Sequence, residues 1–195
     1  MIYVIISAVI VIALIVFLIL RRAQLIKNGT FGPVKVRSIM KSASKFRNCR
    51  VLNDVKLEYK DKTMNFENIL VGPFGMVFAD SLGEYGEYYG SSDSEKWVRI
   101  SKDGKRTEVP NFYKRSLGDI VTLREVFSKN DLYKIPLEHF TVIALNSKKT
   151  NICINSTPDL IELSKFKKLL KSSKYDADNG VDVQKLCDFL CSCKK

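Results

Sequence analysis

The chain has 195 residues, of which 46% are hydrophobic, and a formal net charge of +11 at pH 7. Its length predicts one domain and one additional segment, and its charge is typical of proteins that bind the phosphates of anionic lipids or nucleic acids. A single histidine argues against most histidine-based catalysis, and five cysteines, an odd number, indicate free thiols rather than a disulfide framework.

The N-terminal segment is the most apolar part of the chain. Residues 2–20 form a run of 19 residues without a charge. At about 1.5 Å per residue a helix of this length spans roughly 28 Å, close to the hydrocarbon core of a bilayer. A cleaved signal peptide is disfavoured because no basic residue precedes the run and no Ala-x-Ala site follows it. Arg21, Arg22 and Lys27 follow the run, which predicts a single-pass anchor over residues 1–22 in the cell membrane, with the N-terminus outside and the rest cytosolic.

The segment after the anchor predicts a linker, a helix and then strands. Residues 23–32 are predicted to be a juxtamembrane linker, in which the helix continues to residue 28 and then breaks. Pro33 is well placed as the first residue of a helix over 33–46, because its missing N–H costs nothing there. Strands are predicted at 49–59, with a turn or bulge at 53–54, and at 65–71 and 76–80, the last two joined by a tight turn at 72–75.

The second half of the chain alternates between strands and helices. Its predicted elements are a loop with a short strand at 83–90, strands at 96–101, 140–145 and 152–154, and helices at 111–127, 157–171 and 182–193. This order predicts an α/β domain over 33–174, with a mixed central sheet flanked by helices, and a helical tail over 175–195. The tail carries Cys187, Cys191 and Cys193. Without a second cluster of metal ligands, we interpret Cys187 and Cys191 as part of an apolar helix face rather than as a zinc site.

Several stretches resemble, in their order and spacing, the NERD (nuclease-related domain) family. The stretches are Gly29 and Gly32 with Val36 and Met40; 51–55; 66–75; 76–82 with Gly86, Gly90 and Trp97; and, more weakly, 111–123. The family is similar in its core to restriction-endonuclease-like PD-(D/E)XK folds, and its domains often lie beside a bacterial transmembrane helix. The resemblance covers most of the chain after residue 28 and implies a restriction-endonuclease-like domain.

The resemblance also implies a nuclease site that this chain has largely lost. A nuclease of this type needs carboxylates that hold a divalent metal, Mg²⁺ or Mn²⁺, and a lysine nearby. The family's metal Asp falls on Glu67 and the Glu of its Glu-x-Lys motif falls on Asp80, so both positions keep a carboxylate. The other implied positions carry different chemistry: Pro33 replaces a Glu, Leu82 the Lys, Arg115 a Gln and Asn68 a His. Lys56, Lys60 and Lys62 are the nearest substitutes for the lost lysine.

Three functions therefore compete. The first is a membrane-anchored NERD-like domain that has lost cleavage and is retained to bind nucleic acid, a lipid surface or a protein partner of unknown identity. The second is an active but atypical nuclease that uses Glu67 and Asp80 as catalytic and metal-binding residues. The third is a scaffold whose basic face lies on anionic lipid of the inner leaflet. A purely structural role is the alternative for both carboxylates, with Glu67 paired to a lysine and Asp80 capping Gly83.

Overall fold

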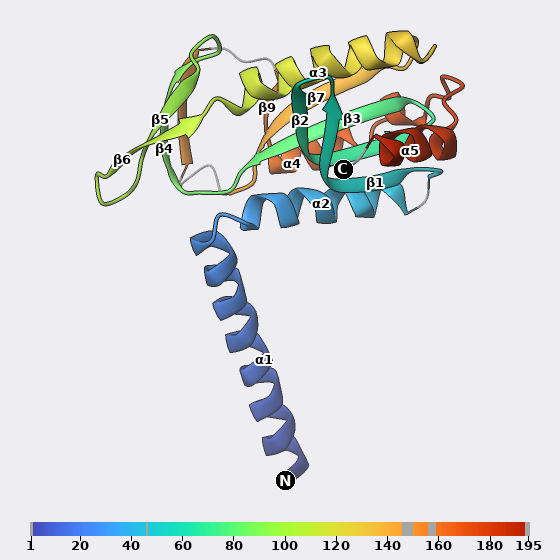
Figure 1. The fold of residues 1–195 in the computed structure, drawn as a ribbon. Helices are drawn as coiled ribbons and strands as arrows, with labels where there is room; N and C mark the ends of the chain where they lie inside the picture. The colour runs from blue at the N-terminus through green and yellow to red at the C-terminus, as the bar shows by residue number, and fades with distance from the viewer. Residues whose placement is uncertain (1, 46, 146–149, 156–158, 194–195) are drawn as a thin grey trace.

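A computed structural model describes residues 2–45, 47–145, 150–155 and 159–193. Within those ranges the chain forms five α-helices, one short 3-10 helix and nine strands in two sheets. One long helix, α1, stands away from an α/β domain that contains all the other elements (Figure 1). The predicted α/β class, with mixed pairing and an apolar N-terminal helix, is confirmed.

Helix α1 spans Ile2–Lys27, and its large apolar side chains from Ile5 to Leu20 are exposed. It is long and apolar enough to cross a membrane, with a mean hydropathy of 2.6 over its most apolar window. It ends where Gly29 adopts a left-handed backbone (φ 68°) and donates its N–H to the carbonyl of Ile26. The predicted linker over 23–32 is therefore mostly helical, and the break between helices is confined to residues 28–30.

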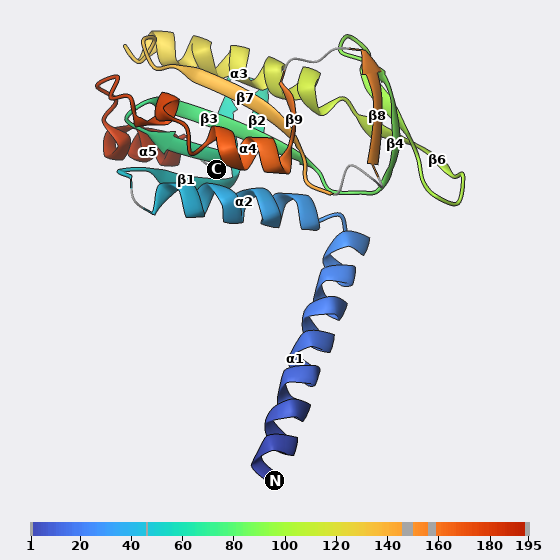
Figure 2. The same cartoon turned by 180° about the vertical axis from the view of Figure 1, so that it is seen from behind.

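Helix α2 spans Phe31–Ser44 and lies across the end of α1 (Figures 1 and 2). It begins two residues earlier than predicted, so Pro33 is its third residue and not its first. The prediction was too strict because none of the first four N–H groups of a helix has an intrahelical acceptor, and proline is tolerated throughout that turn. Val36 and Met40 are fully buried against the main sheet.

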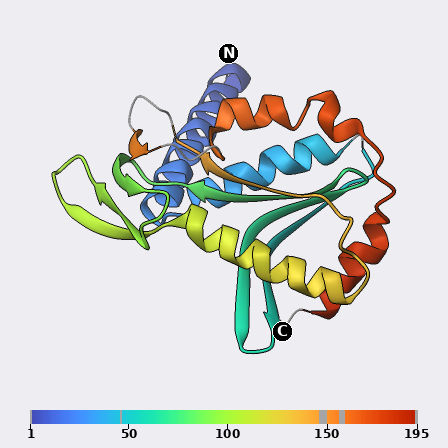
Figure 3. The ribbon, with the colours of Figure 1, turned by 90° about the horizontal axis from the view of Figure 1, so that it is seen from above.

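The main sheet has five strands in the order β1-β2-β3-β7-β9 (Figure 3). Its strands β1 (Arg50–Tyr59), β2 (Lys62–Gly72) and β3 (Gly75–Leu82) pair antiparallel. Strands β7 (Leu137–Ile143) and β9 (Leu160–Glu162) extend the sheet in parallel with β3. The predicted turn at 72–75 joins β2 to β3, and the predicted strand at 140–145 lies mostly in β7.

Strands β1 and β2 form one hairpin, in which β1 agrees with the predicted strand at 49–59 within one residue and β2 extends beyond the predicted 65–71 at both ends. Its register runs through residues 53–54 without an added residue, so the predicted bulge is wrong in that detail. Instead Asp54 adopts a left-handed backbone (φ 50°), and its pairing with Glu67 is missing from an otherwise continuous ladder. The strands are therefore disturbed at the position where Glu67 lies.

Helices cover both faces of the main sheet (Figure 3). Helices α2 and α4 (Leu163–Leu169) pack on one face, and α3 (Phe112–Lys129) and α5 (Val183–Ser192) on the other. All of β3 is buried, and its side chains alternate between these two layers, so Phe78 packs beneath α3 while Val77 packs beneath α2.

The helix predicted over 157–171 was placed too early. Residues 160–162 pair with β7 as strand β9, and α4 begins only at Leu163; residues 157 and 158 lie outside the described residues. A strand partner therefore overrides the local helix signal. The predicted helices at 111–127 and 182–193 correspond to α3 and α5, and a short 3-10 helix, η2 (Ser173–Asp176), lies between α4 and α5.

A second sheet stands at the end of the first. Its order is β6-β5-β4-β8, from β6 (Arg106–Pro110), β5 (Lys96–Ile100), β4 (Gly86–Ser91) and β8 (Thr150–Asn155). Trp97 is fully buried here and packs with Leu82 and Tyr88. The predicted strand at 152–154 belongs to this sheet, and β6 was not predicted at all.

Candidate functional site

Asp80 lies in the interior, on the face of β3 that α3 covers. Its side chain is 4% exposed, and its Oδ2 accepts a hydrogen bond from the hydroxyl of Ser116 on α3. His139 Nε2 on β7 lies 3.4 Å from the same oxygen, and Arg115 Nη2 lies 3.7 Å from Oδ1. Asp80 is therefore a buried carboxylate with three partners and not a turn residue that caps Gly83.

Glu67 lies beside Asp80, at the interrupted position of the β1–β2 ladder. The Ser81 hydroxyl donates to Glu67 Oε1 over 2.7 Å, the Ser81 backbone N–H donates to Oε2 over 3.3 Å, and Asn68 Nδ2 donates to Oε1 over 3.1 Å. Burial raises the pKa of Glu67 to about 7, and the negative charge of Asp80 adds to this rise. No lysine among the described residues pairs with Glu67, whose described partners are Ser81 and Asn68.

The first turns of α3 supply the only cation of this cluster within the described ion pairs. Arg115 stacks over the Phe112 ring, 5.2 Å from its centroid, and its charge lowers the pKa of Glu67 against the effects of burial and Asp80. Asp119, one helical turn further on, accepts a hydrogen bond from the Asn65 N–H over 3.1 Å. Burial raises the pKa of Asp119, and the charge of Arg115 opposes that rise. The guanidinium group of Arg115 is therefore close enough to Asp80, Glu67 and Asp119 to interact electrostatically with all three carboxylates.

Asn111 positions this end of α3. Its side chain accepts a hydrogen bond from the Lys114 N–H as the helix cap, and its amide donates to the carbonyls of Ser92 and Ser94. The cap therefore ties the β4–β5 loop of the second sheet to the start of α3. This connection holds Arg115 and Ser116 over the end of β3.

Part of the cluster lacks hydrogen-bond partners. Asn68 Oδ1, His139 Nδ1 and Thr141 Oγ1 are buried, and none has a hydrogen bond within the described part of the protein. Thr141 faces Asp80 directly in the parallel pairing of β3 with β7. Buried polar atoms are normally paired, so three unpaired ones around Asp80 and Glu67 are unusual.

The arrangement does not fit the divalent metal that the resemblance implies. Mg²⁺ prefers a set of several hard oxygen ligands, whereas Asp80 lies beside the basic groups of Arg115 and His139. Arg115 already supplies positive charge next to Asp80. Among the described residues, no group of three or more His, Cys, Asp and Glu side chains is placed to hold a metal ion.

The other implied positions contribute nothing to such chemistry. Pro33 lies in α2, and Leu82, 2% exposed, packs against Trp97. The substitute lysines at positions 56, 60 and 62 are exposed, and within the described ion pairs none reaches Glu67 or Asp80.

Among the described residues, the cysteines belong to no cluster of potential metal ligands. All five are free, and Cys187 is buried on α5 between Leu186 and Leu190, where burial raises the pKa of its thiol. Cys191 is exposed, so only half of the predicted apolar face is correct.

Sequence reasoning missed Ser116, Asp119 and His139 as members of the cluster. Asp119 follows Arg115 by four residues and Ser116 by three, which is helical spacing and a weak signal for a polar stripe on α3. His139 becomes a neighbour of Asp80 only through the parallel pairing of Phe78 with His139, for which the sequence carries no local signal.

Fold and site define a class of protein: an α/β domain with mixed sheets and a buried carboxylate cluster, behind one N-terminal helix that is long and apolar enough to span a membrane. No family model, no curated protein and no solved structure matches the chain. The NERD resemblance therefore stays a prediction that depends on the residues alone.

Proposed function

We propose that this protein is a membrane-anchored, nuclease-related domain that no longer cleaves nucleic acid and that binds phosphate-bearing ligands at the cytosolic surface of the cell membrane. The anchor is α1, and the basic residues that follow its apolar run favour a cytosolic domain. The nuclease relation is supported by the order of the resembling stretches, by a mixed sheet flanked by helices, and by the proximity of Glu67 to Asp80.

One observation carries the loss of cleavage. Asp80, in the position of a metal-binding Glu, has its carboxylate against Ser116, His139 and Arg115. A cation and two hydrogen-bonding groups of the protein therefore occupy the environment in which an active nuclease would need a metal. With Leu82 in place of the lysine, the group that would stabilise the transition state is also missing, and losing one such group costs about 10²–10³ in rate.

Cleavage of labelled DNA and RNA tests this proposal. The full-length protein in neutral detergent is incubated with each substrate in Mg²⁺, Mn²⁺ or EDTA, beside the variant Asp80→Asn, which keeps the side-chain shape. We expect no metal-dependent cleavage in the wild type beyond that of the variant. Cleavage that needs the metal and disappears in Asp80→Asn overturns the proposal and establishes the active, atypical nuclease instead.

A further inference from the structure

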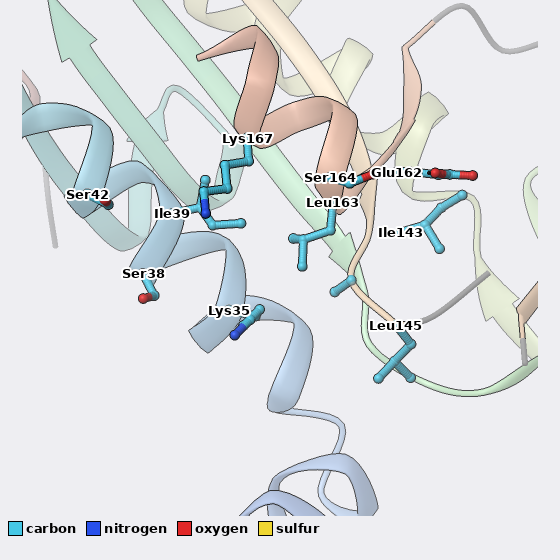
Figure 4. A pocket seen from close by; sticks show the side chains of 11 residues that line it. Lys35, Ser38, Ile39, Ser42, Ile143, Leu145, Glu162, Leu163, Ser164 and Lys167 are labelled. Atoms are coloured by element: carbon cyan, nitrogen blue, oxygen red, sulfur yellow. Dashed lines mark hydrogen bonds between the residues drawn. The ribbon is translucent and has the colours of Figure 1, made fainter. Parts of the chain in front are cut away.

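The groove between α2 and α4 is a second site, on the opposite face of the main sheet from Asp80. It has a volume of about 540 Å³ and opens between the two helices and the end of β7 (Figure 4). Lys35 lines it from α2, and Lys167 extends from α4 toward Ile39 (Figure 4). Two cations from different helices therefore flank one cavity.

The two helices that form the groove are basic and carry no acidic residue. Their cations are Lys35, Arg37 and Lys41 on α2, and Lys165, Lys167 and Lys168 on α4. Arg37 is paired with Asp54, but within the described ion pairs Lys35 and Lys167 have no acidic partner. Glu162 is the one carboxylate in the groove lining, next to Ser164. The groove thus offers ammonium groups to an anion.

The remaining lining has the character of a lipid site. Ser38, Ser42 and Ser164 provide hydroxyl donors, while Leu145 and Leu163 provide apolar surface. A phospholipid headgroup combines a phosphate with an adjoining apolar glycerol-ester region, and both kinds of surface are present. None of the lining residues, all of which are described, is aromatic. A groove for single-stranded nucleic acid usually has aromatic side chains on which bases stack, so lipid is favoured.

The groove also lies where it can reach a lipid headgroup, close to the end of α1. Residues 21–27 continue α1 beyond its apolar run by about 10 Å, whereas the headgroup layer on each side of a bilayer is roughly 5–8 Å thick. With α1 along the bilayer normal, the first turn of α2 therefore lies just outside the headgroup layer, and Lys35 is in the second turn of that helix. Figures 1 and 2 show α2 on the side of the domain from which α1 leaves.

We infer that the groove between α2 and α4 binds the headgroup of an anionic phospholipid from the same membrane that α1 spans. The inference rests on the anchoring in the proposed function but not on the loss of cleavage. Lys35 and Lys167 contact the phosphate, and the three serines donate hydrogen bonds to it or to the ester oxygens. Binding holds the domain at a fixed distance from the inner leaflet, with α3 turned away from it.

Native mass spectrometry of the full-length protein in neutral detergent tests the inference, with phosphatidylglycerol or zwitterionic phosphatidylcholine added as the probe. We expect retained phosphatidylglycerol and little phosphatidylcholine. The double variant Lys35→Gln, Lys167→Gln should retain phosphatidylglycerol about 30-fold less, since each lysine near an anionic surface contributes about 1 kcal/mol. Both lysines are exposed, so the variant is expected to fold.

The matched control is Arg124→Gln, Lys129→Gln, which removes the same charge from exposed positions on α3. Equal loss in both double variants, or no preference for phosphatidylglycerol, overturns the inference. Displacement of the lipid by glycerol 3-phosphate at matched concentration would assign the groove to a soluble phosphate ester, and displacement by a short oligonucleotide would assign it to nucleic acid; either result also overturns it.

Membrane flotation separates this inference from the anchoring on which it rests. The groove variant is expected to stay in the membrane fraction because α1 is intact. A wild-type protein that does not float contradicts the anchor, and the groove inference falls with it. A wild-type protein that floats but retains no anionic lipid contradicts the groove alone.

Discussion

The two faces of the main sheet differ in where they place polar groups. Beneath α3, polar side chains lie inside the protein, where Asp80 contacts Ser116 and His139. Beneath α2 and α4 the interior is apolar, and the charges lie outside, around a groove. The residues that resemble a nuclease site therefore lie on the α3 face, whereas the groove flanked by Lys35 and Lys167 lies on the other face.

The first way to test this contrast is Leu82→Lys, which introduces the lysine that the proposed relation to nucleases implies at this position. Leu82 is 2% exposed and packs against Trp97, so the new ammonium group would be buried without a carboxylate partner among its apolar neighbours. We expect a loss of at least about 4 kcal/mol in the free energy of unfolding and no gain of cleavage. Denaturant titration followed by the fluorescence of Trp97, the one tryptophan, measures the loss.

Leu82→Met is the matched control and should cost less than about 1.5 kcal/mol, because it conserves volume and polarity. Metal-dependent cleavage by a stable Leu82→Lys protein would show that Asp80 can bind a catalytic metal despite its contacts with Ser116, His139 and Arg115, and it would contradict the proposed loss of cleavage.

The next largest effect is expected from Asp80→Ala. Removing a buried carboxylate leaves Ser116 and His139 without their common acceptor, and breaking a buried charged pair typically costs about 3–5 kcal/mol. We expect a loss of about 3 kcal/mol, measured by the same titration. Asp119→Ala, which removes one hydrogen bond at the half-buried edge of the cluster, should cost about 1 kcal/mol. If the Asp80→Ala protein were more stable than the wild type, Asp80 would be kept for function at a cost in stability.

The smallest effect is a dependence on pH that arises from Glu67. Its pKa is raised from 4.5 to about 7 in the folded protein, so between these values the folded state holds a proton that the unfolded chain has released. The free energy of unfolding therefore falls as the pH rises through this window, by at most about 1.4 kcal/mol per pH unit. Asp119 contributes in the same direction, because burial also raises its pKa.

Glu67→Gln removes the contribution of Glu67 and should flatten this dependence, which denaturant titrations between about pH 5 and about pH 7 measure. An unchanged slope in the variant would show that Glu67 is ionised in the folded protein throughout this range. The same experiment shows whether the pH dependence comes from the carboxylate cluster or from the groove. The Lys35→Gln, Lys167→Gln variant should keep the wild-type dependence of the free energy of unfolding on pH.

Local signals determined several elements of this protein from the sequence alone. The apolar run of α1 needs no partner to be recognised, and the Pro-Phe pair at 73–74 forms the expected turn between two glycines. Asp182 caps α5 through the Lys185 N–H, within one residue of the predicted start. In each case the energy that decides the structure comes from residues within a few positions of one another.

Tertiary structure alone decided the rest. Residues 160–162 form a strand because β7 offers an open edge, and residues 150–155 join the second sheet because β4 offers another. The neighbours of Asp80 come from β7 and from α3, both distant in the chain, and the groove of Lys35 and Lys167 exists because α2 and α4 pack on one face. Pairing between distant strands and packing of distant helices leave no periodic pattern in the sequence. The sequence can therefore predict which strand carries a carboxylate such as Asp80, but it cannot predict which side chains contact that carboxylate.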